Sequence, residues 1–411
     1  MLIKRLAPFG IALFLFSASI LATGPATEWY VHQWLKPGVI ETASENAIPS
    51  LFQGTLLQGL ALQNSSILPM YGSSEFGHGG RYNPTKLFTG EPTGWMPYLV
   101  GHAGSEDIIQ ALYASAQDLK GKKIALSLSA QWFGGSGIAQ NTFGANFSAL
   151  QAYNMLANPS LTDQTKKVFA QRLIQFNEVK QGYPILAGML RYYGQTDLKS
   201  RLLEAVYWPM GKIELAALEI QDATKTVNVL NALPPKEVAQ NANSIGPKAL
   251  PSWSLQIQKA NADVKKNENN NPYGVSNQYY NQNEKKLPTI KNSSVKSYFY
   301  PSPEYKDLDL LMQVLKDEGA EPIFMIQPVN GRWYDLMGFP KEQRQKYYDE
   351  IRQRCNENGF ALADMSNHEY DLYFMDDPSH PSEKGWLYFD EVLNNFKTGQ
   401  LHGPQNVELT P

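Results

Sequence analysis

Short apolar runs alternate with amphipathic helical patterns along much of the chain. The apolar runs are about the length of buried strands, and several end in the glycine, serine or asparagine residues that favour turns. These runs lie at residues 65–76, 97–105, 122–133, 321–331 and 360–367. Helical patterns occupy residues 106–119, 308–319 and 342–359. Strands that alternate with helices predict a parallel α/β sheet, whose ligand site lies at the carboxyl ends of the strands.

A long insertion separates the third predicted strand from the fourth. Residues 66–144 form the first part of the expected α/β domain, and residues 301–411 form its second part. The insertion, residues 145–300, begins with Leu, Ala, Gln and Lys at helical spacing, which predicts a helical subdomain. Residues 28–65 have the pattern of an amphipathic region that connects the domain to the amino terminus.

The second half of the insertion is strongly polar. Residues 265–286 read KKNENNNPYGVSNQYYNQNEKK, a composition that predicts an exposed loop. Across residues 251–300, lysines outnumber acidic residues seven to three, although the whole chain has a net charge of −3. A solvated loop is the favoured interpretation of this local charge, and a docking patch for an anionic polymer is the alternative.

The amino terminus has the pattern of a membrane anchor. Lys4 and Arg5 precede an uncharged run over residues 6–27, and a helix of about 22 residues spans roughly 30 Å, the thickness of the hydrocarbon core. The basic pair should stay in the cytoplasm, which places the rest of the chain outside the cell. We therefore expect residues 1–27 to be a retained transmembrane helix. The alternative is a cleaved signal peptide, with its processing site among the small residues of 22–26.

Net charge and cysteine content speak against two classes of function, nucleic-acid binding and cysteine-based catalysis. The chain has 411 residues, enough for one large domain or two smaller ones, and its net charge of −3 predicts no general attraction to nucleic acid. Cys355 is the single cysteine, so no intrachain disulfide can form. It lies in a helical pattern that ends at a glycine, which favours a structural role over a catalytic one.

A serine nucleophile needs a general base, and the candidates are the six histidines of the chain, residues 32, 78, 102, 368, 380 and 402. His380 follows Asp377 by three residues, so that one loop can carry both a base and the carboxylate that orients it. His78 and His102 have no aspartate at a fixed short offset, and we expect neither to be the base. His368, which follows Asp364 by four residues, is the alternative base. The neighbouring Asp376 is expected to point elsewhere.

The nucleophile is expected in the Gly-Ser-Ser-Glu block at residues 72–75. A glycine before the serines permits a tight turn after the first strand that exposes the hydroxyl of Ser74, while Ser73 should point back toward the strand. A simple Gly-Ser turn is the alternative reading. The Gly-x-Ser-x-Gly elbow of α/β-hydrolases does not fit, because Phe76 stands where its second glycine would be.

A serine after the first strand combined with Asp-x-x-His near the carboxyl end resembles the SGNH (GDSL-like) hydrolases. Ser73 is a departure, since that superfamily usually has aspartate before the nucleophile. Within the superfamily the whole chain resembles the DltD family of D-alanyl-lipoteichoic acid biosynthesis proteins. The matching blocks, besides the anchor, are residues 72–75, 101–104, 129–133 and 377–386.

The resemblance implies an SGNH-like three-layer α/β domain whose catalytic triad is Ser74, His380 and Asp377. It also implies an oxyanion hole built from the serine N–H, a glycine after the second strand and an amide after the third. The glycine would be Gly101 or Gly104, and Gln131 stands in place of the usual asparagine. Trp132 is expected to pack the wall of the site.

The implied function is D-alanyl transfer to lipoteichoic acid on the outer membrane face through a serine acyl-enzyme. A membrane O-acyltransferase and proteins of the D-alanyl carrier pathway would be its partners, and the triad needs neither metal nor cofactor. An extracytoplasmic serine esterase or thioesterase that removes acyl groups from cell-wall polymers is the first alternative. A non-catalytic scaffold that binds the carrier protein is the second, and the expected sidedness speaks against it.

Overall fold

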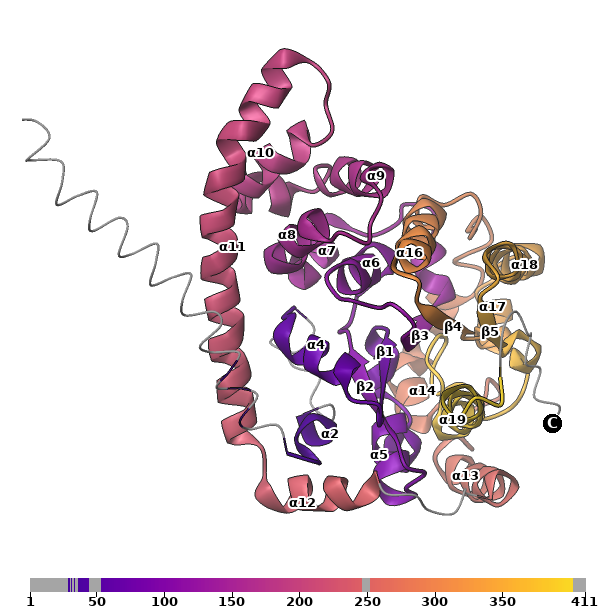
Figure 1. Ribbon diagram of the computed structural model, residues 1–411. Helices are drawn as coiled ribbons and strands as arrows, with labels where there is room; N and C mark the ends of the chain where they lie inside the picture. The colour runs from indigo at the N-terminus through magenta and orange to yellow at the C-terminus, as the bar shows by residue number, and fades with distance from the viewer. Residues whose placement is uncertain are drawn as a thin grey trace, which may run out of the picture.

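A five-stranded parallel sheet forms the centre of the protein (Figure 1). The computed structural model describes residues 29, 31, 33, 36–43, 53–245 and 252–401. The strands are β1 (Ile67–Tyr71), β2 (Met96–Val100), β3 (Lys123–Leu128), β4 (Glu321–Ile326) and β5 (Ala361–Asp364). Four of them fall inside the apolar runs and β2 begins one residue before its run, so the prediction of a parallel α/β sheet is confirmed.

The strand order is β2-β1-β3-β4-β5, and every neighbouring pair is parallel. From β1 the chain moves to one side to form β2, and then returns to place β3 on the other side of β1. The connections therefore reverse direction between β1 and β3. Open parallel sheets bind ligands at such a point, just beyond the carboxyl ends of the strands.

Helices cover both faces of the sheet. Alternate strand residues point to opposite faces, so Leu126 and Phe324 belong to one apolar cluster, whereas Ala125 and Met325 belong to another. The first cluster is covered by α6 (Asp107–Ser115), α16 (Glu304–Glu318) and α18 (Lys341–Asn358). The second is covered by α5 (Pro84–Gly90) and α19 (Glu383–Lys397). Helix, sheet and helix thus form three layers around the strands.

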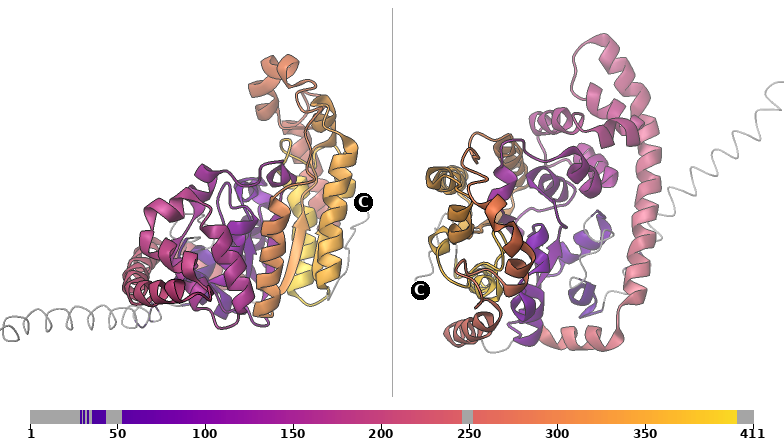
Figure 2. Two further views of the ribbon diagram at one scale, coloured as in Figure 1. Left: turned by 90° about the horizontal axis from the view of Figure 1, so that it is seen from above. Right: turned by 180° about the vertical axis from the view of Figure 1, so that it is seen from behind.

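The insertion between β3 and β4 is mostly helical, as its spacing predicts. Its longest element is α11 (Leu198–Ala232), a helix of 35 residues that runs along one side of the molecule (Figures 1 and 2). Besides α16, the other α-helices described between these strands are α7 (Gln140–Asn146), α8 (Ala149–Ala157), α9 (Asp163–Leu173), α10 (Pro184–Tyr192), α12 (Pro235–Ser244), α13 (Trp253–Asn267), α14 (Asn277–Asn283) and α15 (Leu287–Ile290).

The polar segment 265–286 is more ordered than the expected exposed loop, and that prediction is wrong in part. It contains the end of α13, all of α14 and a connection folded by its own side chains. The side-chain oxygen Oδ1 of Asn271 accepts hydrogen bonds from the N–H groups of Tyr273 and Val275, and Ser276 caps α14. Val275 is fully buried. Asparagine and serine side chains therefore provide the backbone contacts that hold this segment in place.

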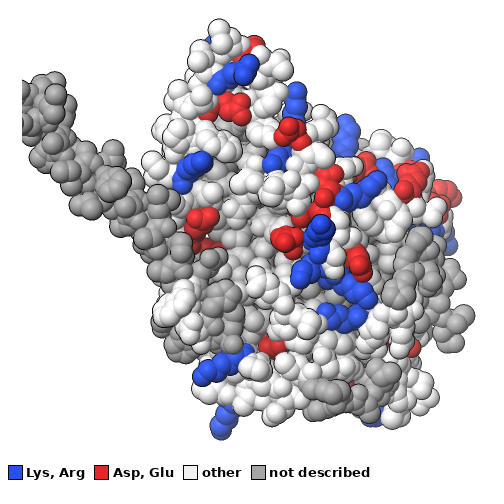
Figure 3. Space-filling model, viewed as in Figure 1, with Lys and Arg blue, Asp and Glu red and all other residues white. Residues whose placement is uncertain are grey.

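The residues that precede β1 join the main core. Val39 and Ile40 of α2 (Val39–Ala43) and Leu57 and Leu60 of α4 (Leu56–Gln63) belong to the larger apolar cluster. Within the described ranges, no helix is both long and apolar enough to cross a membrane. The expected anchor at residues 6–27 lies outside those ranges. On the face shown in Figure 3, basic side chains are interspersed with acidic ones.

Candidate active site

The nucleophile turn follows β1 directly. Gly72 leaves room there for the Glu75 side chain, because a Cβ atom at this position would lie 2.4 Å from Glu75 Oε1. The carboxylate of Glu75 is buried and accepts a hydrogen bond of 2.9 Å from the Ser73 N–H, which closes the turn. Burial raises the pKa of Glu75 despite this bond. Ser74 then begins a short 3₁₀ helix, Ser74–Gly77, at the carboxyl end of the strand.

The turn after β2 packs closely against the nucleophile turn. Gly101 has φ of +144°, and a Cβ atom there would lie 1.9 Å from the Gly72 carbonyl oxygen. Ser73 joins the two turns, because its hydroxyl donates to the His102 carbonyl at 3.1 Å and accepts from the Gly104 N–H at 2.8 Å. The Gly104 N–H is thereby engaged, which leaves the Gly101 N–H as the glycine candidate for the oxyanion hole.

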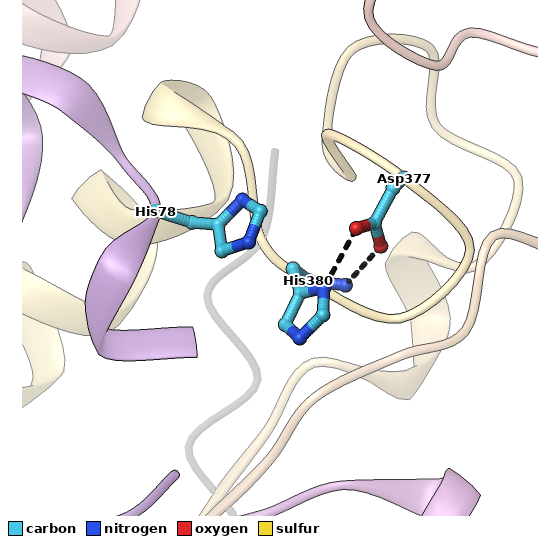
Figure 4. A group of neighbouring side chains, drawn as sticks. All are labelled: His78, Asp377 and His380. Atoms are coloured by element: carbon cyan, nitrogen blue, oxygen red, sulfur yellow. Dashed lines mark hydrogen bonds and ion pairs between the residues drawn. The ribbon is translucent and has the colours of Figure 1, made fainter. Parts of the chain in front are cut away.

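The loop that follows β5 supplies a histidine and its carboxylate. Asp377 Oδ1 accepts hydrogen bonds from the N–H groups of Ser379 (2.8 Å) and His380 (2.9 Å). Its other oxygen, Oδ2, lies 2.7 Å from His380 Nδ1, as the dashed lines of Figure 4 show. On the far side of the ring, His380 Nε2 lies 2.8 Å from Ser74 Oγ. The structure therefore joins Ser74, His380 and Asp377 in one hydrogen-bonded chain.

The electrostatic environment of His380 suits a general base. Burial alone would lower the pKa of His380, but the hydrogen bond and charge of Asp377, with smaller contributions from Glu75 and Asp376, raise it above the usual value. Burial alone would raise the pKa of Asp377, but its bonds to His380 and Ser379 lower it. Asp377 therefore stays ionised and stabilises the imidazolium form of His380.

The two site residues predicted after β3, Gln131 and Trp132, differ in their exposure. Gln131 is exposed on a short 3₁₀ helix, Ala130–Phe133, and its Oε1 accepts a hydrogen bond of 3.2 Å from the Ser379 hydroxyl, one residue before His380. Its amide nitrogen is the group that can donate to a substrate. Trp132 is buried in the larger apolar cluster.

His368 does not occupy the base position. Its Nδ1 lies 2.7 Å from Asp371, and its buried ring stacks on Phe374 with centroids 4.5 Å apart. Asp364, the carboxylate expected to accompany it, instead accepts a hydrogen bond of 2.6 Å from Arg352. The pairing of His368 with Asp364 is therefore wrong. Cys355 is buried in α18, and burial raises the pKa of its thiol, as a structural cysteine requires.

A second histidine–aspartate pair lies beside the first, and the sequence alone did not indicate it. His78 Nδ1 lies 2.8 Å from Asp376 Oδ2, and the His78 ring stacks on the His380 ring with centroids 4.3 Å apart and planes 5° apart (Figure 4). Asp376 points away from His380, as expected, but it stays in the site as the partner of His78. Asn83 positions the loop of His78, since its amide donates to the carbonyl groups of Phe76 and His78.

Ligating atoms of His78, Asp377 and His380 all lie within 4.8 Å of one another, a spacing compatible with a metal ion. However, His380 contacts Ser74 with one ring nitrogen and Asp377 with the other. An ion bound by His380 would have to displace one of these contacts. The contacts of His380 with Ser74 and Asp377 therefore compete with coordination of an ion by this residue.

A cavity of about 670 Å³ opens beside the paired histidines. It is lined by His78, Asp376 and Asp377 from the loops after β1 and β5, and by residues of the polar segment of the insertion. The site therefore combines the carboxyl ends of β1 and β2, the loop after β5 and a segment inserted between β3 and β4.

This arrangement defines a class: an α/β protein that carries a Ser–His–Asp constellation at the carboxyl end of a parallel sheet. The chain belongs to the DltD family, whose sequence profile, described as DltD protein, matches residues 45–398. It is 36% identical to Protein DltD of Bacillus subtilis (strain 168) over 358 residues, which are 86% of this chain and 88% of that protein. It is 28% identical to Protein DltD of Staphylococcus aureus (strain NCTC 8325 / PS 47) over 365 residues, 88% of each chain. It is 25% identical to Protein DltD of Lacticaseibacillus rhamnosus over 414 residues, 99% of this chain and 93% of that protein.

Proposed function

We propose that this protein transfers D-alanyl groups to the hydroxyl groups of lipoteichoic acid through an acyl-enzyme on Ser74. Membership of the DltD family supports a role in teichoic acid D-alanylation. The observation that carries the mechanism is the chain of contacts from Ser74 Oγ through His380 to Asp377, at 2.8 and 2.7 Å. Nucleophile, base and orienting carboxylate are thus already within hydrogen-bond reach.

In the first half of the proposed reaction, Ser74 Oγ gives its proton to His380 Nε2 and attacks the carbonyl carbon of the D-alanyl donor. The negative charge of the tetrahedral intermediate falls on the former carbonyl oxygen. The N–H groups of Ser74 and Gly101 and the side-chain amide of Gln131 are the proposed donors to that oxygen. Each such donor contributes roughly 3 kcal/mol of transition-state stabilisation. His380 then protonates the leaving group, and the alanyl ester of Ser74 remains.

Intact-mass analysis tests this first half directly. Purified protein mixed with an activated D-alanine ester should gain the mass of one alanyl group, located by peptide mapping at Ser74. Glycerol added afterwards should remove the group as D-alanyl-glycerol, whereas release only as free D-alanine would identify a hydrolase. Absence of any adduct, together with product formation by the Ser74→Ala variant, would exclude a serine acyl-enzyme.

The proposed reaction takes place outside the cell, where lipoteichoic acid is exposed. Lys4 and Arg5 before the uncharged run over residues 6–27 support a single membrane anchor with the folded domain on the outer face. In this position the domain would work with a membrane O-acyltransferase and with the pathway that supplies D-alanine on a carrier protein.

Protease added to intact protoplasts should therefore digest the domain without prior lysis. A cytoplasmic protein in the same sample serves as the control and should stay intact until detergent opens the membrane. If the domain is protected to the same extent as that control, its orientation is the reverse of the one proposed. The proposed acceptor would then be out of reach of Ser74.

A further inference from the structure

The two histidine–aspartate pairs of the site are built alike. In each, an aspartate of the loop after β5 lies within 2.8 Å of the Nδ1 atom of one histidine, and these aspartates are the neighbours Asp376 and Asp377. The rings are parallel and stacked. A carboxylate at Nδ1 fixes the tautomer in which Nε2 carries the lone pair and can take a proton. His78 therefore has the arrangement of a general base, as His380 does.

The histidines differ in what they face. The His78 side chain is 27% exposed and lines the cavity, together with Asp376 and Asp377. The His380 side chain is 16% exposed and does not line that cavity, and its Nε2 is directed at Ser74 Oγ. A molecule that enters through the cavity thus reaches the His78 ring before the His380 ring.

The part of the cavity lining that comes from the insertion is suited to a polyhydroxylated molecule. It is formed by neutral polar side chains, which include Asn267, Ser276, Asn277, Gln278 and Gln282. Amide side chains both donate and accept hydrogen bonds, and so they match the hydroxyl groups of a polyol without requiring a charge. A ligand-binding role would explain why this segment is rich in asparagine and glutamine, whereas a solvated loop does not require that composition.

We propose that the cavity binds the polyol acceptor and that His78, oriented by Asp376, is the general base that activates its hydroxyl. This proposal rests on the acyl-enzyme at Ser74. The acceptor hydroxyl gives its proton to His78 Nε2, and its oxygen bonds to the acyl carbon. The bond from that carbon to Ser74 Oγ breaks, and Oγ takes a proton from the imidazolium form of His380.

The protons balance over the full cycle. His380 acquires a proton from solvent before the second half begins, and His78 returns one to solvent when it ends. With two bases, the proton of the acceptor is removed on the cavity side while the proton for Ser74 is supplied on the other. A single imidazole would have to turn between the two oxygens or serve both from one position.

Kinetics of the two half-reactions test this assignment. The p-nitrophenyl ester of D-alanine as donor and glycerol as acceptor separate acylation, read from the nitrophenol burst, from transfer, read as D-alanyl-glycerol. In the His78→Gln variant the amide can still donate to Asp376 but cannot take up a proton. The ratio of the transfer rate constant to the acylation rate constant should fall about 100-fold, the range expected for loss of a general base.

The Asp376→Asn variant is the second test, and it should lower the ratio of transfer to acylation about tenfold. His368→Gln, which changes a histidine–aspartate pair outside the site, is the matched control and should leave the ratio unchanged. If His78→Gln slows both half-reactions in equal proportion, or neither, His78 is not the acceptor base. A wild-type burst that persists in Ser74→Ala would instead overturn the acyl-enzyme itself.

Discussion

Replacement of Ser74 by alanine should reduce D-alanyl transfer by at least three orders of magnitude and leave the fold intact. The hydroxyl is the proposed nucleophile, and its removal leaves no atom to form the acyl-enzyme, a loss of about 4 kcal/mol of transition-state stabilisation at 1.4 kcal/mol per decade. Teichoic acid D-alanine content in a deletion strain complemented with the variant measures the effect. Normal D-alanine content with the alanine variant would exclude Ser74 as the nucleophile.

Ser73→Ala is the matched control, because it removes the adjacent hydroxyl. Ser73 bridges the His102 carbonyl and the Gly104 N–H, so its loss should cost roughly 1–2 kcal/mol of stability and lower activity less than Ser74→Ala. A thermal unfolding curve separates that cost from an effect on chemistry. Equal loss of activity in two folded variants would show that the hydroxyl of Ser73 also takes part in the reaction.

The sheet could be predicted because each strand is a short apolar run with a turn at its end. All five residues of Ile67–Tyr71 are buried, and a strand covered by helices on both faces needs side chains that are apolar on both sides. Such a run stands out against the amphipathic helices around it. The order of the strands is not contained in that local pattern, since it depends on which crossover packs on which face.

The pairing of His380 with Asp377 was predictable because, like each strand, it is encoded in a short stretch of the sequence. Three residues separate them, so one turn fixes both, and the Asp377 carboxylate also accepts the backbone N–H groups of that turn. His78 and Asp376 are separated by 298 residues. They come together because β1 and the loop after β5 end at the same edge of the sheet. No short spacing in the sequence indicates this contact. The loop pattern indicated that Asp376 points away from His380, but it did not show that His78 is its partner.

The polar segment of the insertion shows a different limit of prediction. Composition predicts solvent exposure for asparagine-rich sequences, and many residues of 265–286 are indeed exposed. What composition does not show is that Asn271 folds the connection around the buried Val275. Asn267 and Gln278 of the same segment line the cavity together with His78. A segment inserted far from β1 in sequence therefore completes the site.

His380→Ala should cost two to three orders of magnitude in acylation, roughly 3–4 kcal/mol, because Ser74 would lose its proton acceptor. Asp377→Asn should be nearly as harmful, since the amide can favour the tautomer that puts the proton on Nε2, where the base must accept one. Asp371→Asn, which changes the carboxylate of the His368 pair, is the control and should slow acylation far less. Burst kinetics with the p-nitrophenyl ester of D-alanine measure all three variants.

The pH profile of Asp377→Asn distinguishes a positioned base from a merely structural loop. Burial lowers the pKa of His380, but the contributions of Asp377, Glu75 and Asp376 outweigh it, so the pKa in the folded protein is raised. His380 accepts the serine proton only when neutral, and acylation should therefore rise with pH through that raised pKa. Replacing the carboxylate of Asp377 removes the largest of the raising contributions, so the acid limb of kcat/KM should move to lower pH while its plateau falls. A plateau that falls with no movement of the acid limb would mean that Asp377 does not act on His380 through its charge.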